Sequence, residues 1–243
     1  MPLLDRPVAP AAILAVGIVV GGALVGNGFA RGHRDDRYVT VKGISEREAK
    51  ADLAIWPLHI AAADNDLGRA HDRLVTSAHA VLQFLARNSL DTTAAVVQDL
   101  SVTDEFLEGG SEKPAAARYA IRETIVVRST KPDLVATASQ HVAELVSAGV
   151  VLSSAGEAGS GGPTFIFTGL NTLKPQMIAE ATARAREAAE QFAHDSRSEI
   201  GEIRQASQGV FEILPRDQAP GISEESQIFK TVRVVSTIDY ALR

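Results

Sequence analysis

The stretch from Val8 to Ala30 is mostly apolar and contains no charged side chain. As an α-helix, which rises about 1.5 Å per residue, it is long enough to cross the roughly 30 Å hydrocarbon layer of a bilayer. The pattern predicts one transmembrane helix, with the lipid bilayer as the partner of residues 8–30. Residues 1–31 then form a membrane anchor, or a signal segment cleaved near Ala30, where the sequence GFA has the small-x-small pattern of a cleavage site. The length of the run favours the anchor.

From residue 38 onward the pattern changes to shorter segments. Alternation with a period of two predicts strands, and apolar positions three or four residues apart predict amphipathic helices. The predicted strands cover 38–44, 49–61, 95–107, 117–129, 164–168, 202–214 and 227–242. The predicted helices cover 66–87, 132–148 and 173–194. This order, ββαββ-αβαββ, predicts an α+β domain over residues 38–243 with a mostly antiparallel sheet and about three helices.

The helix predicted over 173–194 has an apolar seam made mostly of alanine. The seam consists of Ile178, Ala181, Ala185, Ala188 and Phe192. Small side chains let a helix approach its neighbour closely, so we expect this helix to pack tightly on a sheet or on another helix. Thr172 is its predicted cap, and Pro175 is predicted in the first turn, where proline is tolerated.

Two local predictions concern the strands. The charged stretch Ser45–Lys50 is predicted to be a polar turn between the first two strands, with a subunit contact as the alternative. One side of the strand over 95–107 is predicted to carry the apolar residues Val96, Leu100, Val102 and Phe106.

Composition narrows the classes of function. Hydrophobic residues make up 45% of the chain and charged residues 22%, which is typical of a folded domain. The formal net charge of −6 and the lack of a basic run argue against a nucleic-acid partner. The chain has no cysteine, which excludes disulfides, thiolate metal sites and a cysteine nucleophile.

Residues with catalytic chemistry are scattered along the chain. None of the six histidines falls in HExxH or a similar spacing, so we predict no metal, cofactor-binding or catalytic site and no cofactor. The tripeptide HDS at 194–196 has the letters of a hydrolase triad, but adjacent side chains on a helix are not expected to face one another. For a hydrolase, Asp52 and Glu123 remain as candidate carboxylates, with His59 as a partner for either acid.

Several segments of the body carry a family resemblance. They are VTVKG at 39–43, Glu46, ADLA at 51–54, the helix LKPQMIAEATARAREAAEQFA at 173–193, and the closing pair of strands. In these segments, and in the order of elements from 38 to 242, the chain resembles the SIMPL-domain family, which in bacteria includes oxidative-stress-defence-like envelope proteins. The resemblance implies an envelope protein, exported or anchored, that is often oligomeric, has a link to envelope stress defence and has no agreed catalytic residues.

The sequence gives conflicting signals on orientation. Counted on the arginines at 31, 34 and 37 and on Lys42, the positive-inside rule puts the body in the cytoplasm, but the rule is weak when a large domain follows the span. The resemblance implies a periplasmic body and therefore a single-pass inner-membrane protein. The leading hypothesis is a membrane-anchored, periplasm-facing protein that acts without catalysis, by homo-oligomeric assembly or by binding. The alternatives are the hydrolase and a module that captures a small ligand or a protein with the loop predicted over 153–163.

Overall fold

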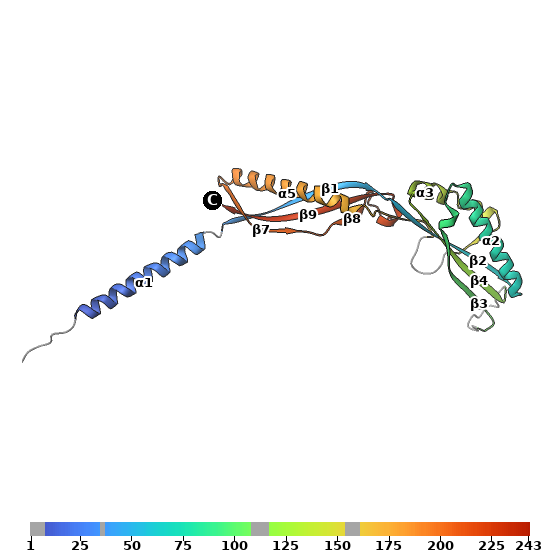
Figure 1. Ribbon diagram of the computed structural model, residues 1–243, viewed down its shortest axis with the longest axis horizontal. Coiled ribbons are helices and arrows are strands. Elements are labelled where there is room, and N and C mark those ends of the chain that lie inside the picture. Colours follow the sequence, from blue (N-terminus) through green and yellow to red (C-terminus); the bar gives the residue numbers. More distant parts are fainter. Residues whose placement is uncertain (1–7, 35–36, 108–116, 154–160) are drawn as a thin grey trace, which may run out of the picture. The chain divides into compact units, whose positions relative to one another are not determined.

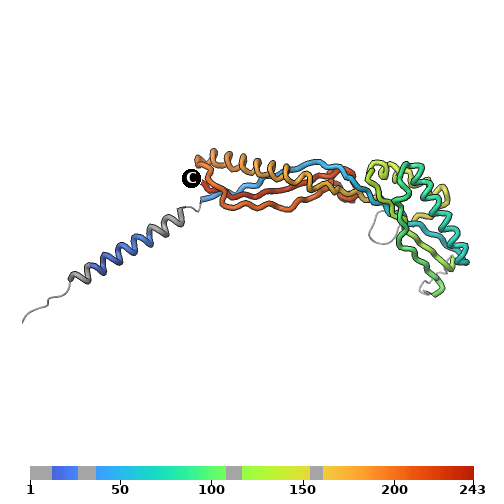
Figure 2. Tube along the Cα trace, viewed as in Figure 1, coloured from blue at the N-terminus to red at the C-terminus, as the bar shows by residue number. Residues whose placement is uncertain are grey.

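The computed structural model describes residues 8–34, 37–107, 117–153 and 161–243, with side chains from 13 to 26 and from 37 onward in these ranges. The described chain contains five α-helices and nine strands, which Figures 1 and 2 trace from the N-terminus to the C-terminus. It divides into two compact units. Unit 1 contains the residues up to Ser45, Gln176–Val210 and Val234–Arg243, and unit 2 contains Glu46–Pro175 and Phe211–Arg233.

Helix α1 (Val8–Arg34) begins with the predicted transmembrane segment and continues past its end. The large apolar side chains described in it, from Ile13 to Val25, are between 51% and 74% exposed. In the described part of the chain, no helix is both long enough and apolar enough to span a bilayer. The helical form of this segment is confirmed. The membrane span stays a prediction, and the side chains of residues 8–12 and 27–30 lie outside the described residues.

Strand β2 (Leu53–Asp64) is central to the sheet of unit 2. It pairs with β4 (Tyr119–Ser129), whose other neighbour is β3 (Ala95–Asp104), and the order is β3-β4-β2-β5. The short strands β5 (Val151–Leu152) and β6 (Thr164–Ile166) both pair with β2. All of these pairings are antiparallel, which confirms the predicted α+β class with antiparallel pairing.

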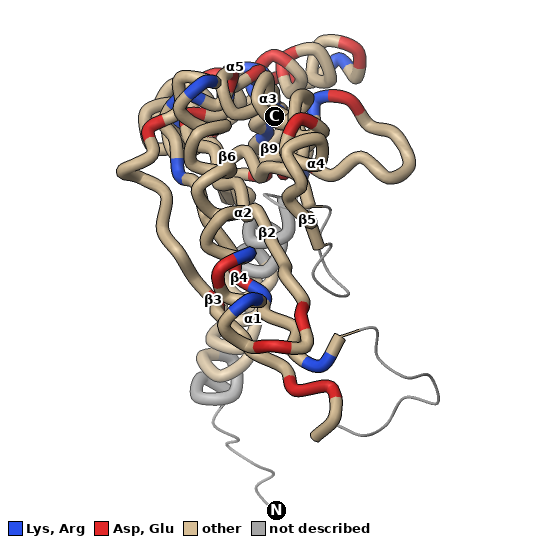
Figure 3. The backbone as a smooth tube through the Cα atoms, turned by 90° about the vertical axis from the view of Figure 1, so that its right-hand side faces the viewer, with Lys and Arg blue, Asp and Glu red and all other residues tan. Residues whose placement is uncertain are grey.

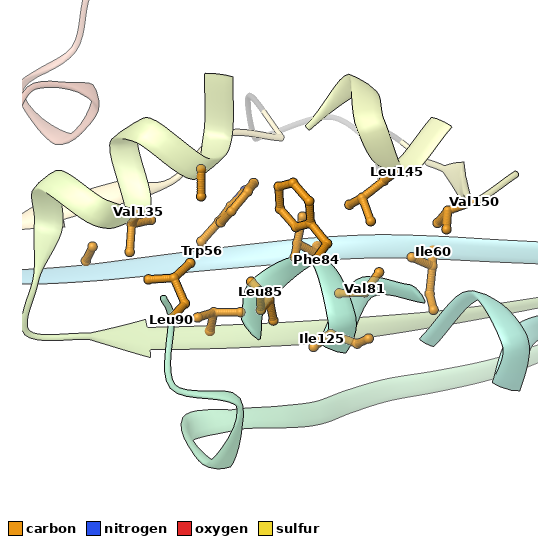
Figure 4. Packing of buried hydrophobic residues seen from close by; sticks show 14 of the residues in the cluster. Trp56, Ile60, Val81, Phe84, Leu85, Leu90, Ile125, Val135, Leu145 and Val150 are labelled. Atoms are coloured by element: carbon orange, nitrogen blue, oxygen red, sulfur yellow. The ribbon is translucent and has the colours of Figure 1, made fainter. Parts of the chain in front are cut away.

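Three helices cover one face of this sheet: α2 (Leu67–Arg87), α3 (Pro132–Gln140) and α4 (Ala143–Ser147). They contribute to one hydrophobic core with the side chains that β2 directs to this face, and Figure 4 shows part of it. Trp56 of β2 packs edge-on against Phe84 of α2, with 6.3 Å between ring centroids. Because side chains alternate along a strand, the neighbours of Trp56 point to the opposite face, where they are only half-buried.

Strand β9 (Phe229–Leu242) organises the second sheet. It pairs with β1 (Tyr38–Lys50) and with β7 (Ile200–Gln208), and β8 (Glu212–Pro215) also pairs with it. Two side-chain contacts show that β1 and β9 run antiparallel. Thr40 Oγ1 donates to Asp239 Oδ1 at 2.7 Å, and Glu46 Oε1 lies 3.4 Å from Arg233 Nε. Glu46 follows Thr40 by six residues on β1, whereas Arg233 precedes Asp239 by six residues on β9.

Helix α5 (Leu170–Asp195) packs unusually close to β1, as its alanine seam predicts. A Cβ atom added at Gly43 of β1 would overlap the backbone oxygen of Ala181 and lie 2.5 Å from the backbone nitrogen of Ala185. Two polar contacts accompany this approach: Ser45 Oγ donates to Glu180 Oε2 at 2.9 Å, and Arg184 Nη1 donates to the Ile44 carbonyl oxygen at 2.9 Å.

The seam itself differs in part from the prediction. Ala181 and Ala185 are buried as expected, but Ala188 and Phe192 are exposed and Ile178 is half-buried. The buried residues are Met177, Ala181, Ala185, Ala189 and Ala193. They repeat strictly every four residues, because the helix packs one i, i+4 ridge of side chains against the sheet. The predicted seam instead has spacings that alternate between three and four residues.

Three predicted boundaries in the sheets and helices are wrong. β1 continues through Ser45–Lys50, which was expected to be a turn. Ser45 and Ala49 are buried there while Glu46, Glu48 and Lys50 are exposed, as in the alternation of a strand. The strand predicted over 202–214 divides into β7 and β8, next to Gly209, whose N–H donates to the Val235 carbonyl oxygen at 2.8 Å. The helix predicted over 132–148 divides into α3 and α4.

The start of α5 also differs from the prediction. The helix begins at Leu170, so Thr172 is not its cap and Pro175 is not in its first turn. Both the N–H and the hydroxyl of Thr172 donate to the Gly169 carbonyl oxygen, at 3.1 and 2.7 Å, and this closes a turn before the proline is reached. Pro175 then costs the helix a hydrogen bond that its missing N–H would have made.

The close approach at Gly43 gives a direct test of the packing. We expect Gly43→Ala to lower the free energy of unfolding by about 3 kcal/mol, because backbone atoms of α5 must move to accept the methyl group. Urea unfolding followed by circular dichroism measures this change. Gly161→Ala is the control, since a Cβ atom there meets nothing within 4 Å. An equal effect of the two substitutions would show that α5 does not approach β1 this closely in solution.

Candidate functional site

Asp52, the first candidate carboxylate, is used to join two strands. Its Oδ1 accepts a hydrogen bond from the Thr168 backbone N–H at 2.9 Å, and its Oδ2 accepts one from the Thr168 hydroxyl at 3.0 Å. Its own N–H donates to the Ile166 carbonyl oxygen at 3.0 Å. Both carboxylate oxygens therefore hold the segment after β6 against the start of β2.

Glu123 and His59 lie far along the sheet from Asp52 and do not face each other. Glu123 is opposite Ile60, eight residues from Asp52, a separation of about 27 Å along the strand. His59 is opposite Thr124, with 2.9 Å between His59 Nδ1 and Thr124 Oγ1. Because successive side chains alternate, His59 and Glu123 point to opposite faces of the sheet. The structure brings no two of the three candidates together.

The HDS tripeptide at 194–196 does not form a triad. His194 Nδ1 lies 3.2 Å from Asp195 Oδ1, so these neighbours do meet, contrary to the sequence-based expectation. The Ser196 hydroxyl, however, donates to the Ala193 carbonyl oxygen at 3.2 Å. Among the residues that the structure describes, no group of three or more histidine, aspartate or glutamate side chains could hold a metal ion.

The start of α2 carries a cluster of charges around Asp64. Arg69 Nη2 lies 2.8 Å from Asp64 Oδ1, and Arg73 Nη2 lies 2.9 Å from Asp64 Oδ2. The hydrogen bond from Arg69, followed by one from the Asp66 backbone N–H, lowers the pKa of Asp64 below its usual value. The cluster fixes the first turn of α2 to the end of β2.

Lys230 is a second charged group with a structural contact. Its side chain is fully buried, and its Nζ donates to the Glu224 carbonyl oxygen at 2.7 Å and pairs with the Glu224 carboxylate. A buried cation that lost such a partner would be strongly destabilising. This contact ties β9 to the short 3-10 helix Glu224–Ser226 of unit 2.

The most unusual surface of unit 2 is strand β3, at one end of its sheet. Within the described chain β3 pairs only with β4. Its apolar side chains are each more than half exposed: Val96 54%, Val97 57%, Leu100 58% and Val102 54%. Its charged residues are Asp99 and Asp104 alone; Figure 3 colours acidic and basic residues along the backbone. An exposed apolar edge strand is a template for pairing with another chain.

A bulge explains why the predicted face of β3 is wrong. The register shifts between Gln98 and Ser101, and Asp99 has a positive φ of 53°. As a result Val96 is opposite Val126 while Val102 is opposite Ile121, and these two partners point to different faces of β4. One feature of the sequence indicates this exposure. Valines occupy the adjacent positions 96 and 97, whereas a strand with one buried face would have a polar residue at one of them.

These observations define a two-unit α+β protein whose described polar groups mostly serve structure and whose edge strand is exposed. A family model, SIMPL, described as a protein of unknown function (DUF541), matches residues 39–235. The chain therefore belongs to the SIMPL family, as its resemblance to that family implied. A comparison with curated proteins found no match.

The Asp64 cluster gives a pH prediction. Because the pKa of Asp64 is lowered on folding from its ordinary value of 3.8, the ionised carboxylate stabilises the fold above pH 3.8, and this contribution is lost as the pH falls towards the folded pKa. We expect Asp64→Asn to lower the thermal midpoint at pH 7, with a difference from the unsubstituted protein that shrinks below pH 3.8. Asp72→Asn, which removes an exposed acid of α2, is the control. A pH-independent difference would contradict the assignment.

Proposed function

We propose that this SIMPL-family protein is held at a membrane by α1 and works through non-covalent contacts, by homo-oligomeric assembly or by binding, and not by catalysis. The observation that carries the proposal is the exposed edge strand β3, with apolar side chains on both faces. A soluble surface seldom leaves such a strand uncovered unless it pairs with something. A role in envelope stress defence is consistent with the family resemblance.

A second copy of the chain is the occupant that this edge fits best. Two β3 strands can pair antiparallel about a twofold axis, so that each strand presents the same residues to the other. The bulge between Gln98 and Ser101 interrupts the ladder and divides β3 into two short regular segments, Ala95–Gln98 and Ser101–Asp104. Such a short ladder favours a contact reinforced by a second interaction, for which α1 is the candidate.

The anchor is supported by the sequence of α1 and by the exposure of its described side chains. The large apolar side chains from Ile13 to Val25 are each more than half exposed, and a lipid environment favours an exposed apolar helix of this kind. We propose an inner-membrane location with the body in the periplasm. The alternative is export after cleavage near Ala30.

The two other hypotheses receive less support. A hydrolase needs reacting groups within contact of one another, and Asp52, Glu123 and His59 are apart in the sheet of unit 2. The loop of the ligand-capture hypothesis lies mostly outside the described residues, at 154–160.

The assembly is tested by the solution mass of the intact protein in mild detergent beside that of a chain starting at Arg31. We expect the intact protein to be oligomeric and Val97→Lys to shift it towards the monomer, because a charge on an edge strand disfavours pairing. Val75→Lys is the matched control, an exposed valine on α2 in the same unit. A strictly monomeric intact protein would rule out assembly, and equal effects of the two lysine variants would rule out β3 as the contact.

The location has a separate test. Protease added to cells whose outer membrane has been opened is expected to digest the body and to leave a short fragment that contains α1. Protease added to inverted inner-membrane vesicles is expected to leave the body intact. The reverse pattern would put the body in the cytoplasm, as the charge count suggested.

A further inference from the structure

A groove of about 800 Å³ opens in unit 2 on the face of the sheet opposite α2. Its volume lies within the range of small-molecule sites, roughly 300–1,000 Å³. Three aliphatic side chains from three adjacent strands line it: Ile55 of β2, Val126 of β4 and Val96 of β3. Arg128 and Lys131 line it at the end of β4 and just beyond, and Asp91 lines it from the segment before β3.

The strand register explains how apolar and charged side chains come together here. Val96 is directly opposite Val126, and Ile55 is directly opposite Arg128. Neighbouring strands are about 4.8 Å apart, so the aliphatic floor extends about 10 Å across the sheet. Val126 and Arg128 are two residues apart on one strand and so point to the same face, which places the guanidinium directly beside the floor.

The charges of the groove do not balance. Among the described residues, no carboxylate pairs with the side chain of Arg128 or Lys131, in contrast to Arg69, Arg73, Arg118 and Arg216 of the same unit. Asp91 is engaged by Thr93, whose N–H and hydroxyl donate to its Oδ1 at 2.9 and 2.7 Å. These hydrogen bonds lower the pKa of Asp91 and keep it ionised at neutral pH. Two cations and one carboxylate leave one positive charge beside an apolar floor.

We propose that this groove binds a single-chain amphiphile with a carboxylate head group, such as a fatty acid. The chain lies over Ile55, Val126 and Val96, and the carboxylate pairs with Arg128 and Lys131. An arginine fork matches a carboxylate in a bidentate geometry. A monoanionic head neutralises the single excess charge, whereas a doubly charged phosphate would be repelled by Asp91. The site goes beyond the proposed assembly and does not depend on it.

The test uses the intact protein in phosphatidylcholine nanodiscs, titrated calorimetrically with decanoate below its micellar concentration, with the heat from empty nanodiscs subtracted. We expect saturable binding that weakens by at least about tenfold in the double variant Arg128→Gln/Lys131→Gln, because the head group loses both charged partners. Decyltrimethylammonium, which has a similar chain and the opposite charge, is expected not to bind.

Arg122→Gln is the matched control. Arg122 is an exposed cation on the same strand and the same face as Arg128, but it does not line the groove. This variant should bind decanoate as the unsubstituted protein does, and thermal unfolding checks that all variants are folded. Decanoate heat no greater than that of empty nanodiscs, or undiminished binding by the double variant, would overturn the site. Tighter binding of decyl phosphate than of decanoate would overturn the choice of head group.

Discussion

In the part of the chain that the structure describes, helices cover one face of each sheet, and most of the protein's properties follow from that constraint. In unit 2 the alternation of β2 directs Trp56, Leu58 and Ile60 into the core beneath α2, where they are almost fully buried. The same alternation directs Ile55, Pro57 and His59 to the other face, where they are half-buried. A single helical layer therefore stabilises the sheet and leaves one face and one edge available for contacts.

In unit 1 a helix also covers one face of a sheet, but the side chains that it buries there are small. Its helix α5 buries a methionine and four alanines, and Gly43 removes the last side chain between helix and strand. Short side chains bring backbones together, so packing depends on shape more than on the apolar area that each residue buries. The polar contacts from Ser45 and Arg184 surround this approach and fix where α5 sits along β1.

The polar groups of unit 2 fall into two kinds, and the difference separates structure from candidate function. Asp52, Asp64 and Lys230 each have partners on neighbouring elements, so their hydrogen bonds and ion pairs hold those elements together. Arg128 and Lys131 have no such partner in the described chain and lie beside an apolar groove. A charge that the fold does not use is available to a ligand, and an apolar strand that the fold does not cover is available to another chain.

The sequence by itself determined the α+β class and the order of the main helices and strands, because period-two and helical patterns are local and depend only on which residues must face a core. It also indicated the close packing of α5, since alanines at helical spacing let the helix backbone approach its neighbour. It did not show strand β5 or the divisions between α3 and α4 and between β7 and β8. Only the tertiary structure decided the register of β3, the continuation of β1 through Ser45–Lys50 and the separation of Asp52, Glu123 and His59. These depend on which residues lie opposite one another across strands, and residues distant in sequence come together there through hydrogen-bond registers and bulges that no local pattern encodes.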